Sequence, residues 1–507
     1  MEDDQKMAFL HRVFIIIIVI GFSRIYGGQI TLSGPGLYPH KFRMPCQYFH
    51  IYSNDSINDN ISVNIEGKFD GKSFHLSHEY YRSTEESFLV HYKMPPSVDS
   101  IQIRVYSNDT GMDVPGSPIS IDERVASPHC HCPNKDFDEW LDESCGLDPQ
   151  IVEDFEFYDR ESTTIPWNIS AFLEVLRSRY PNPRSQSYCH YALVDNEVYR
   201  TCFGEYVGFN MFVDNVLHYL TRITIIPDVE FIINLGDWPL WEKITNYPQA
   251  VPIISWCKND NFSDILWPTY DLTQASLECM GRQEVHVFSV REESSHIPWH
   301  EKINKGIWRG RDSNTSRLKL VKLSKESPES LDAGITRYFF FRDMENELGI
   351  KDQMPFFDFF KYKYLVTVDG TVASYRLPYL LSGNSVVLKQ ESNYYEHYYK
   401  QLIPYVHYIP IKDDLSDLNQ QIQWARVHED LVQEISENGR KLVDDLLLPE
   451  KVFCYHGQVL REWRKRLAIK GKKVISPDMI HVPQPNTDSI YRQFCSCEHS
   501  KYSKSEL

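Results

Sequence analysis

The chain has 507 residues, of which 53 are Lys or Arg and 70 are Asp or Glu, so its formal net charge is −17. This excess of acid argues against nucleic acid as a main partner, because phosphate binding needs a clustered positive surface. Hydrophobic residues make up 42% and charged residues 24%, which is typical of globular proteins and excludes a largely disordered chain.

Residues 1–27 are predicted to be a secretory signal peptide. The apolar run Val13–Phe22 follows the basic pair His11–Arg12 and precedes the small residues Gly27–Gly28. The run is shorter than the roughly 18 residues of a membrane-spanning helix, so no membrane span is expected. The alternative is an uncleaved type II anchor.

The sequence also carries signs of the secretory pathway outside the signal peptide. Six sequons predict N-glycosylation, at Asn54, Asn60, Asn108, Asn168, Asn261 and Asn314. The tail, residues 491–507, ends in Lys504–Leu507 (KSEL), which resembles the retrieval signal KDEL and departs from it at Ser505. Together these features predict a resident of the endoplasmic reticulum lumen that a retrieval receptor binds.

Eleven cysteines in an oxidising compartment are expected to pair mostly as disulfides, and the odd number leaves at least one over. The segment Cys130–Cys132 contains a histidine between two cysteines. A zinc site is a poor interpretation of it, because no second ligand pair follows at finger spacing. Disulfides are therefore the expectation.

Residues 28–124 are predicted to form an immunoglobulin-like β-sandwich. Apolar and polar residues alternate in Ile61–Ile65, Phe88–Tyr92 and Ile101–Tyr106, which places one face of each strand on a core. The segments Gly34–Leu37 and Gly116–Ile121 resemble the two ends of a filamin-type repeat. No pair of titratable residues suggests chemistry there, so we interpret this domain as a spacer or an interaction module.

Residues 130–480 are predicted to form an α/β domain. Val229–Leu235 and Tyr364–Val368 are the apolar runs expected of buried parallel strands. A helix is predicted over Thr371–Leu381, followed by a strand at Ser385–Leu388. This order of elements favours a doubly wound sheet.

Ligands in such sheets bind beyond the carboxyl ends of the strands, where two loops carry suitable residues. Asp237 follows a buried strand and could act as a general base, although an aspartate there is often only a helix cap. In the second loop, Thr371–Ser374 would offer helix N–H groups to a phosphate, and Arg376 could neutralise one. The basic residues near Arg311 and Arg317 could extend that site or form a solvated loop.

Asp136–Asp138 matches an Asp-x-Asp metal pattern but follows no strong strand, so no metal is expected.

Several motifs in order resemble the CAP10-like glycosyltransferases, glycosyltransferase family 90. They are Asn234–Leu240, Trp308–Ser313, Asp369–Tyr379, Ser385–Ser392, Tyr394–Tyr399 and His407–Pro410. With the filamin-like front and the KDEL-like tail, the chain resembles the KDEL motif-containing protein O-glucosyltransferases of that family.

The resemblance implies a GT-B fold of two Rossmann-like lobes. It implies inverting, metal-independent transfer of glucose from UDP-glucose to serine hydroxyls of folded EGF-like repeats, as in Notch and fibrillins. The general base falls on Asp237, and the donor contacts fall on Arg317, Thr371, Val372, Ala373, Ser374, Tyr375 and Arg376. Arg311 is expected to be a further donor contact, although it stands where a relative has a donor-contact serine, and Gly236 stands where that relative has an arginine.

The sequence leaves the sugar, glucose or xylose, undecided, together with the repeats that are modified and the oligomeric state. A non-catalytic binder or chaperone of folded repeats is the remaining alternative.

Overall fold

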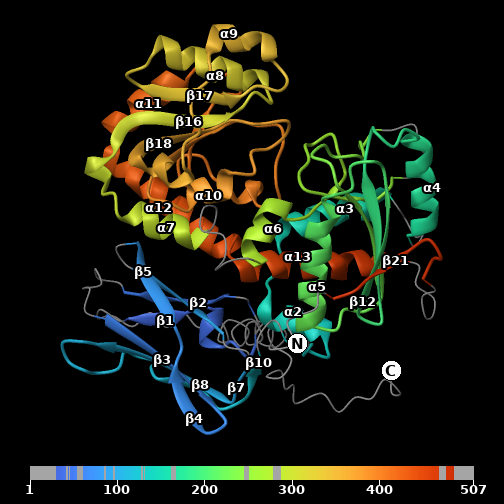
Figure 1. Cartoon of the computed structure of the whole chain (residues 1–507), viewed down its shortest axis with the longest axis vertical. Helices are drawn as coiled ribbons and strands as arrows, with labels where there is room; N and C mark the ends of the chain where they lie inside the picture. Colours follow the sequence, from blue (N-terminus) through green and yellow to red (C-terminus); the bar gives the residue numbers. More distant parts are fainter. Residues whose placement is uncertain are drawn as a thin grey trace, which may run out of the picture.

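A computed structural model describes residues 30–41, 44, 46–53, 61–84, 87–94, 97–126, 130, 132–161, 167–244, 250–277, 287–467 and 475–484. The expected signal peptide, the KSEL tail and the sequons at Asn54 and Asn60 lie outside the described residues. The chain forms a β-rich N-terminal part and two α/β lobes, which lie beside one another in Figure 1. None of the described helices is long and apolar enough to span a membrane.

The N-terminal part is a sandwich of two four-stranded antiparallel sheets, ordered β1-β2-β6-β5 and β4-β3-β8-β9. Apolar side chains from facing strands, among them Phe49, Ile65, Val90 and Ile103, share one core between the sheets, as the alternation predicts. The elements are β1 (Thr31–Ser33), η1 (Pro35–Leu37), β2 (Cys46–Tyr52), β3 (Ile61–Phe69), β4 (Lys72–His75), β5 (His78–Thr84), β6 (Ser87–Lys93), β7 (Ser97–Val98), β8 (Ser100–Ser107), β9 (Ile119–Ile121) and β10 (Val125–Ala126).

The sandwich packs against the α/β part instead of standing apart from it. Both faces of β6 are buried, and Tyr48 and Leu89 belong to a core cluster shared with helices of the second lobe. The Tyr48 hydroxyl donates to Glu450 at 3.3 Å, at the start of α13. The interpretation of this domain as a spacer is therefore incomplete, because its outer sheet face is an internal interface.

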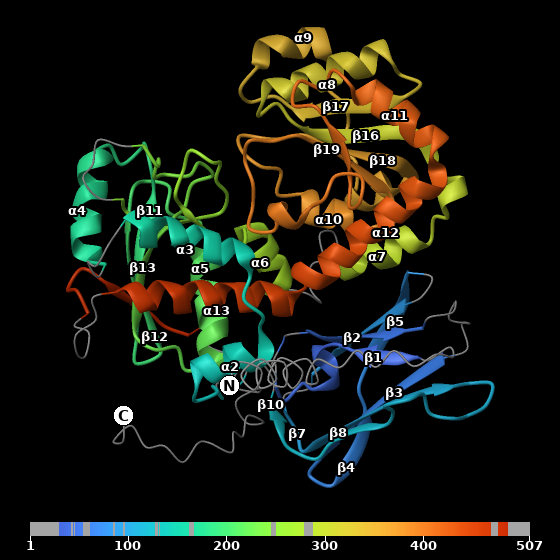
Figure 2. The same ribbon diagram turned by 180° about the vertical axis from the view of Figure 1, so that it is seen from behind.

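The first lobe is built on a six-stranded sheet with the order β15-β14-β13-β11-β12-β21. Helices that follow the sandwich in sequence, together with α13 from near the end of the chain, cover this sheet (Figures 1 and 2). The elements are α2 (Phe137–Ser144), α3 (Pro149–Glu161), α4 (Ile169–Arg179), β11 (Tyr188–Val194), β12 (Glu197–Phe203), α5 (Asn210–Ile223), β13 (Val229–Asn234), β14 (Ile254–Ser255), β15 (Ile265–Leu266), α6 (Tyr270–Leu277), α13 (Pro449–Arg466) and β21 (Ile480–Val482).

This sheet is mixed, and in that respect it differs from the parallel sheet of a Rossmann-like lobe. Strand β11 pairs antiparallel with both β12 and β13, while β13, β14 and β15 are parallel. The cause is a two-residue turn at Asp195 and Asn196, whose φ angles of 52° and 61° suit a tight hairpin between β11 and β12. A disulfide joins Cys189 to Cys202 across this hairpin.

The second lobe holds five parallel strands in the order β17-β16-β18-β19-β20, as the doubly wound prediction requires. Its elements are α7 (Val287–Ser295), η2 (Trp299–Glu301), β16 (Ile303–Arg311), α8 (Thr315–Glu326), β17 (Leu331–Arg337), η3 (Arg342–Met344), α9 (Glu345–Leu348), η4 (Phe356–Lys361), β18 (Tyr362–Thr367), α10 (Leu377–Leu381), β19 (Val386–Gln390), η5 (Tyr399–Gln401), β20 (Ile409–Ile411), α11 (Leu418–Val427) and α12 (Glu429–Leu446).

The helix predicted over Thr371–Leu381 is wrong at its start. Helix α10 begins at Leu377, and residues 371–376 form a loop. Pro378 stands in the first turn of α10, where a missing N–H costs nothing, whereas a helix from Thr371 would place this proline in its interior. The loop therefore presents ordinary backbone and side chains, and no helix terminus, to its surroundings.

The cysteine expectation is confirmed within the described residues. Cys145 is bonded to Cys454, and both Cys130 and Cys132 are in disulfides, which removes the zinc alternative. The free cysteine among the described residues is Cys257, which is buried.

Candidate active site

A cavity of about 250 Å³ lies between the two lobes. Its first-lobe wall comes from the segment after β13 and from the start of α6. Its second-lobe wall comes from the carboxyl ends of β16 and β18 and from the loop before α10. The lining residues are Asp237, Tyr270, Trp308, Arg309, Gly310, Ser313, Arg317, Val366, Thr367, Gly370, Thr371, Val372, Ala373, Ser374, Tyr375, Arg376 and Leu380.

Asp237 is the acidic group among the lining residues. It follows the buried strand β13, whose last residue Asn234 fixes the turn by accepting from the Gly236 N–H at 2.9 Å and donating to the Trp238 carbonyl at 2.6 Å. No described residue donates a hydrogen bond to the Asp237 carboxylate, and burial raises the pKa of this carboxyl above its usual value. Asp237 is thus a positioned carboxylate that is ready to accept a proton.

Two aromatic hydroxyls and a thiol surround this carboxylate. The Tyr270 and Tyr375 rings meet edge to face at 5.7 Å, and burial raises the pKa of both phenols. The Cys257 thiol donates to the Asp237 backbone carbonyl at 3.4 Å and accepts from the Tyr375 hydroxyl at 3.7 Å. The sequence arguments missed Tyr270 and Cys257, because neither stands in a periodic or motif position that signals a site.

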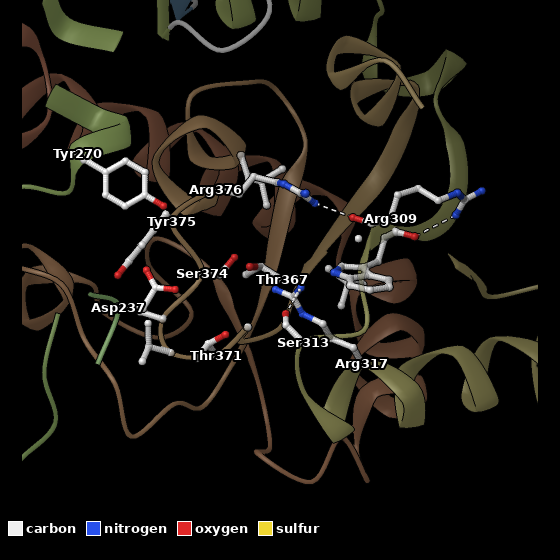
Figure 3. Close-up of a pocket in the computed structure, with 17 residues that line it drawn as sticks. Asp237, Tyr270, Arg309, Ser313, Arg317, Thr367, Thr371, Ser374, Tyr375 and Arg376 are labelled. Atoms are coloured by element: carbon white, nitrogen blue, oxygen red, sulfur yellow. Dashed lines mark hydrogen bonds between the residues drawn. The ribbon is translucent and has the colours of Figure 1, made fainter. Parts of the chain in front are cut away.

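The opposite wall carries guanidinium groups (Figure 3). Arg317 lies in the first turn of α8 and donates to the Asp369 carbonyl at 2.8 Å and to the Ser313 hydroxyl at 2.7 Å. Burial and the nearby charge of Arg376 lower its pKa to about 10, so it remains charged at neutral pH. Arg317 forms no ion pair with a described carboxylate.

Arg376 is the second guanidinium on this wall. It donates to the Arg309 carbonyl at 2.8 Å and lies 5.5 Å from the centre of the Phe359 ring. It too forms no ion pair within the described part of the chain, while the adjacent Arg309 is bound to Asp332 at 2.8 Å. Two guanidinium groups that form no ion pair with a described residue thus face one cavity, and this arrangement suits a multiply charged anion.

The loop before α10 connects the two walls. Val372 and Ala373 are buried and pack on Cys257 of the first lobe, while Thr371 and Ser374 remain partly accessible. Asn314, the N-cap of α8, donates its side-chain amide to the Gly370 carbonyl at 3.0 Å. The sequon asparagine Asn314 therefore holds the start of this loop.

The remaining sequons have more open positions. Asn108 and Asn261 are exposed, and Asn168 is exposed although it caps helix α4.

A main-chain bridge joins the two lobes next to Cys257. The Lys258 N–H donates to the Tyr395 carbonyl at 3.0 Å, and the Tyr395 N–H donates to the Lys258 carbonyl at 2.8 Å. Lys258 belongs to the first lobe and Tyr395 to the second. The distance between the walls is thus fixed by backbone hydrogen bonds.

The structure brings every residue predicted for catalysis or donor binding to this cavity except Arg311. The Arg311 side chain lies 5.1 Å over the Phe339 ring and does not line the cavity. Its neighbour Asp312 is buried, and it accepts from the N–H groups of Phe339, Phe340 and Phe341 at 2.8, 2.8 and 2.6 Å. Asp312 thus supports a loop.

The Asp-x-Asp pattern at Asp136 and Asp138 belongs to a helix start, where Asp136 caps α2 by accepting from the Glu139 N–H at 2.9 Å. Within the described ranges, no group of three or more His, Cys, Asp or Glu side chains is arranged to hold a metal ion.

Comparison with known proteins shows the family of this chain. Residues 164–498 match the family described as Glycosyl transferase family 90. The chain is 38% identical over 490 residues to Protein O-glucosyltransferase 3 of Homo sapiens, covering 94% of this chain and 93% of that protein. It is 38% identical over 474 residues to Protein O-glucosyltransferase 2 of Danio rerio, covering 91% and 92%. Protein O-glucosyltransferase 1 of Homo sapiens is 29% identical over 309 residues, covering 57% of this chain and 77% of that protein.

Proposed function

The chain belongs to glycosyl transferase family 90 and is a glycosyltransferase, and from this premise we propose that it transfers glucose from UDP-glucose to serine hydroxyls of folded EGF-like repeats. The observation that carries the proposal is the pairing of the two cavity walls. A free carboxylate stands on one wall, and two guanidinium groups without carboxylate partners stand on the other.

In the proposed reaction, the serine oxygen attacks the anomeric carbon of glucose while Asp237 accepts the serine proton. The bond between the anomeric carbon and the β-phosphate oxygen breaks, and UDP leaves with the bonding electrons. Attack from the face opposite the leaving group inverts the anomeric centre. A serine hydroxyl is a weak nucleophile at neutral pH, so the reaction depends on a base within hydrogen-bond reach.

The negative charge that develops on the leaving diphosphate needs stabilisation. Arg317 and Arg376 are held by backbone carbonyls and are partly buried, which strengthens their interaction with an anion. Thr371 and Ser374 are accessible on the same loop and can add hydroxyl contacts. We propose that these groups bind UDP and that the transfer needs no metal ion.

The proposed overall architecture is GT-B, with the cavity as the donor site between two lobes, and the sandwich is proposed to be of the filamin type. Its burial against both lobes supports a role in bracing the enzyme. The exposed Trp238, which is 48% accessible beside Asp237, offers an apolar contact for the acceptor.

Mass spectrometry of a folded EGF-like repeat tests the proposal. The repeat is incubated with the enzyme and with UDP-glucose or UDP-xylose in turn, and the Asp237→Asn variant is the control. We expect a hexose on the serine with the native enzyme and none above background with the variant. Addition of a pentose alone would show that UDP-xylose is the donor. No transfer from either donor would contradict the proposed function.

We also propose that the protein resides in the endoplasmic reticulum lumen through its KSEL tail and a retrieval receptor. Removal of Ser505–Leu507 should increase the fraction secreted from cultured cells, as measured by immunoblot of the medium. Unchanged secretion would show that this tail does not retain the protein.

A further inference from the structure

The carboxyl edge of the parallel sheet continues beyond the cavity. Strands β16 and β17 are neighbours, and Arg311 and Arg337, their last residues, are register partners. Gly310, directly before Arg311, lines the cavity. The surface at the ends of β16 and β17 is therefore contiguous with the proposed donor site on the same edge of the sheet.

This surface exposes two phenylalanines. Phe340 is 70% accessible and Phe339 is 37% accessible. Both are held in place, because their N–H groups donate to the buried Asp312 carboxylate. An aromatic side chain that is exposed to water on a fixed backbone is a common feature of binding surfaces.

Two arginines flank these rings. The guanidinium carbons of Arg311 and Arg337 lie 5.1 and 4.7 Å from the centre of the Phe339 ring. Both arginines are exposed, and neither forms an ion pair with a described carboxylate. Some exposed arginines are paired, as Arg184 is with Glu205, and others, such as Arg177, form no ion pair within the described ranges; the distinctive feature here is that two arginines converge on one exposed ring beside the cavity.

Two guanidinium groups on one ring form a local positive patch in a chain whose net charge is −17. A guanidinium stacked on a ring keeps its outer N–H groups free, so it can bind a carboxylate in a bidentate manner. Because the Arg311 and Arg337 side chains lie outside the cavity, they are placed to meet the molecule that reaches the cavity from outside. In the proposed function that molecule is the protein acceptor.

We propose that Arg311, Arg337, Phe339 and Phe340 form a docking surface for an acidic segment of the protein acceptor, next to the serine that receives the sugar. This inference rests on the proposed function. It also gives Arg311 a role other than the donor contact that the sequence suggested.

The test uses one folded EGF-like repeat in two versions, one extended by a short Glu-rich segment and the other by the same segment with Gln in place of Glu. Binding of both to the full-length enzyme is measured by titration calorimetry at low and at high salt. We expect the Glu version to bind about fivefold more tightly at low salt, with a preference that falls as salt rises. The variant Arg337→Gln with Phe340→Ala should lose the preference, and Arg104→Gln in the sandwich should keep it.

Equal binding of the two versions by the native enzyme, or a preference that survives in the double variant, would overturn the docking surface. The midpoint of thermal unfolding is measured for the double variant. A midpoint equal to that of the native enzyme excludes a folding defect. Glucose transfer to both versions is measured in parallel. Charge-dependent binding without any transfer would overturn the proposed function alone, and transfer without charge-dependent binding would overturn the docking surface alone.

Discussion

Two aspartates at strand ends on opposite sides of the cleft have opposite environments. Asp312 follows β16 and accepts three backbone N–H groups; burial acts to raise its pKa, but these bonds outweigh burial and leave the pKa below its usual value. Asp237 follows β13, accepts no hydrogen bond from a described residue, and has a raised pKa because of burial. The position after a strand is the same, so the hydrogen-bond partners distinguish a structural carboxylate from a reactive one.

The sharpest test of this contrast is Asp237→Asn. The amide keeps the shape of the side chain but cannot accept the serine proton, so we expect sugar transfer to fall by at least ~10²-fold. UDP affinity and the thermal unfolding midpoint should remain native, as measured by calorimetry and by scanning fluorimetry. Near-native turnover in a folded variant would contradict the assignment, and loss of folding would support a purely structural role for Asp237.

The second wall is tested by Arg317→Ala and Arg376→Ala. Each change removes a charge-assisted contact, which is worth roughly 1.5–3 kcal/mol of UDP binding free energy. Titration calorimetry with UDP measures the loss, and Arg311→Ala serves as the control because its side chain lies over Phe339. Native affinity in either of the first two variants would exclude that arginine from the donor site, and a similar loss in the control would return Arg311 to it.

Asp312→Asn should act on stability instead of chemistry. An amide oxygen replaces two charged acceptor oxygens, so we expect the free energy of unfolding to fall by about 1–3 kcal/mol, with transfer reduced less than in Asp237→Asn. Because the folded pKa of Asp312 is lowered, its contribution is present above the unfolded pKa and is lost as pH falls through the folded pKa. Acidification should therefore lower the unfolding midpoint of the native protein more steeply than that of the variant. Parallel pH curves would contradict this view.

The smallest effect is expected at Cys257, which links Asp237 to the loop before α10. Cys257→Ala removes both thiol hydrogen bonds and should lower transfer by about 2–10-fold, the value of one weak hydrogen bond or two. Cys257→Ser keeps a donor and an acceptor and should stay close to native. Equal loss in both variants would indicate a packing role for the sulfur.

The sequence predicts much of the second lobe and less of the first. The predicted strands Tyr364–Val368 and Ser385–Leu388 are mostly apolar, as buried parallel strands are, and the structure places β18 and β19 there. The hairpin at Asp195 and Asn196 escaped notice although its two residues favour the left-handed turn conformation that it needs. Pro378 likewise marked the true start of α10.

The site shows a similar division. Motif positions indicated Asp237, Arg317 and Thr371–Arg376, which all line the cavity, but not Tyr270, which lines it as well. The outward orientation of Arg311 could not be predicted, because it depends on the Phe339 ring that β17 brings beside β16 only in the folded chain. Cys257 is close to Asp237 for the same reason, since β13 and β14 pair in parallel.

Helix α13 returns from the end of the second lobe to the first. Phe453, Val459 and Trp463 complete a hydrophobic core to which residues 137–267 contribute most of the other members, and Cys454 is bonded to Cys145. During synthesis, the first lobe therefore emerges early but lacks its central helix until nearly the whole chain has left the ribosome. The apolar surface of the first lobe that α13 covers in the folded protein stays exposed to solvent while the second lobe is synthesised. A chain that stops before residue 449 would lose a folded first lobe along with its terminal helix, so premature termination late in the sequence should be as damaging as termination near its middle.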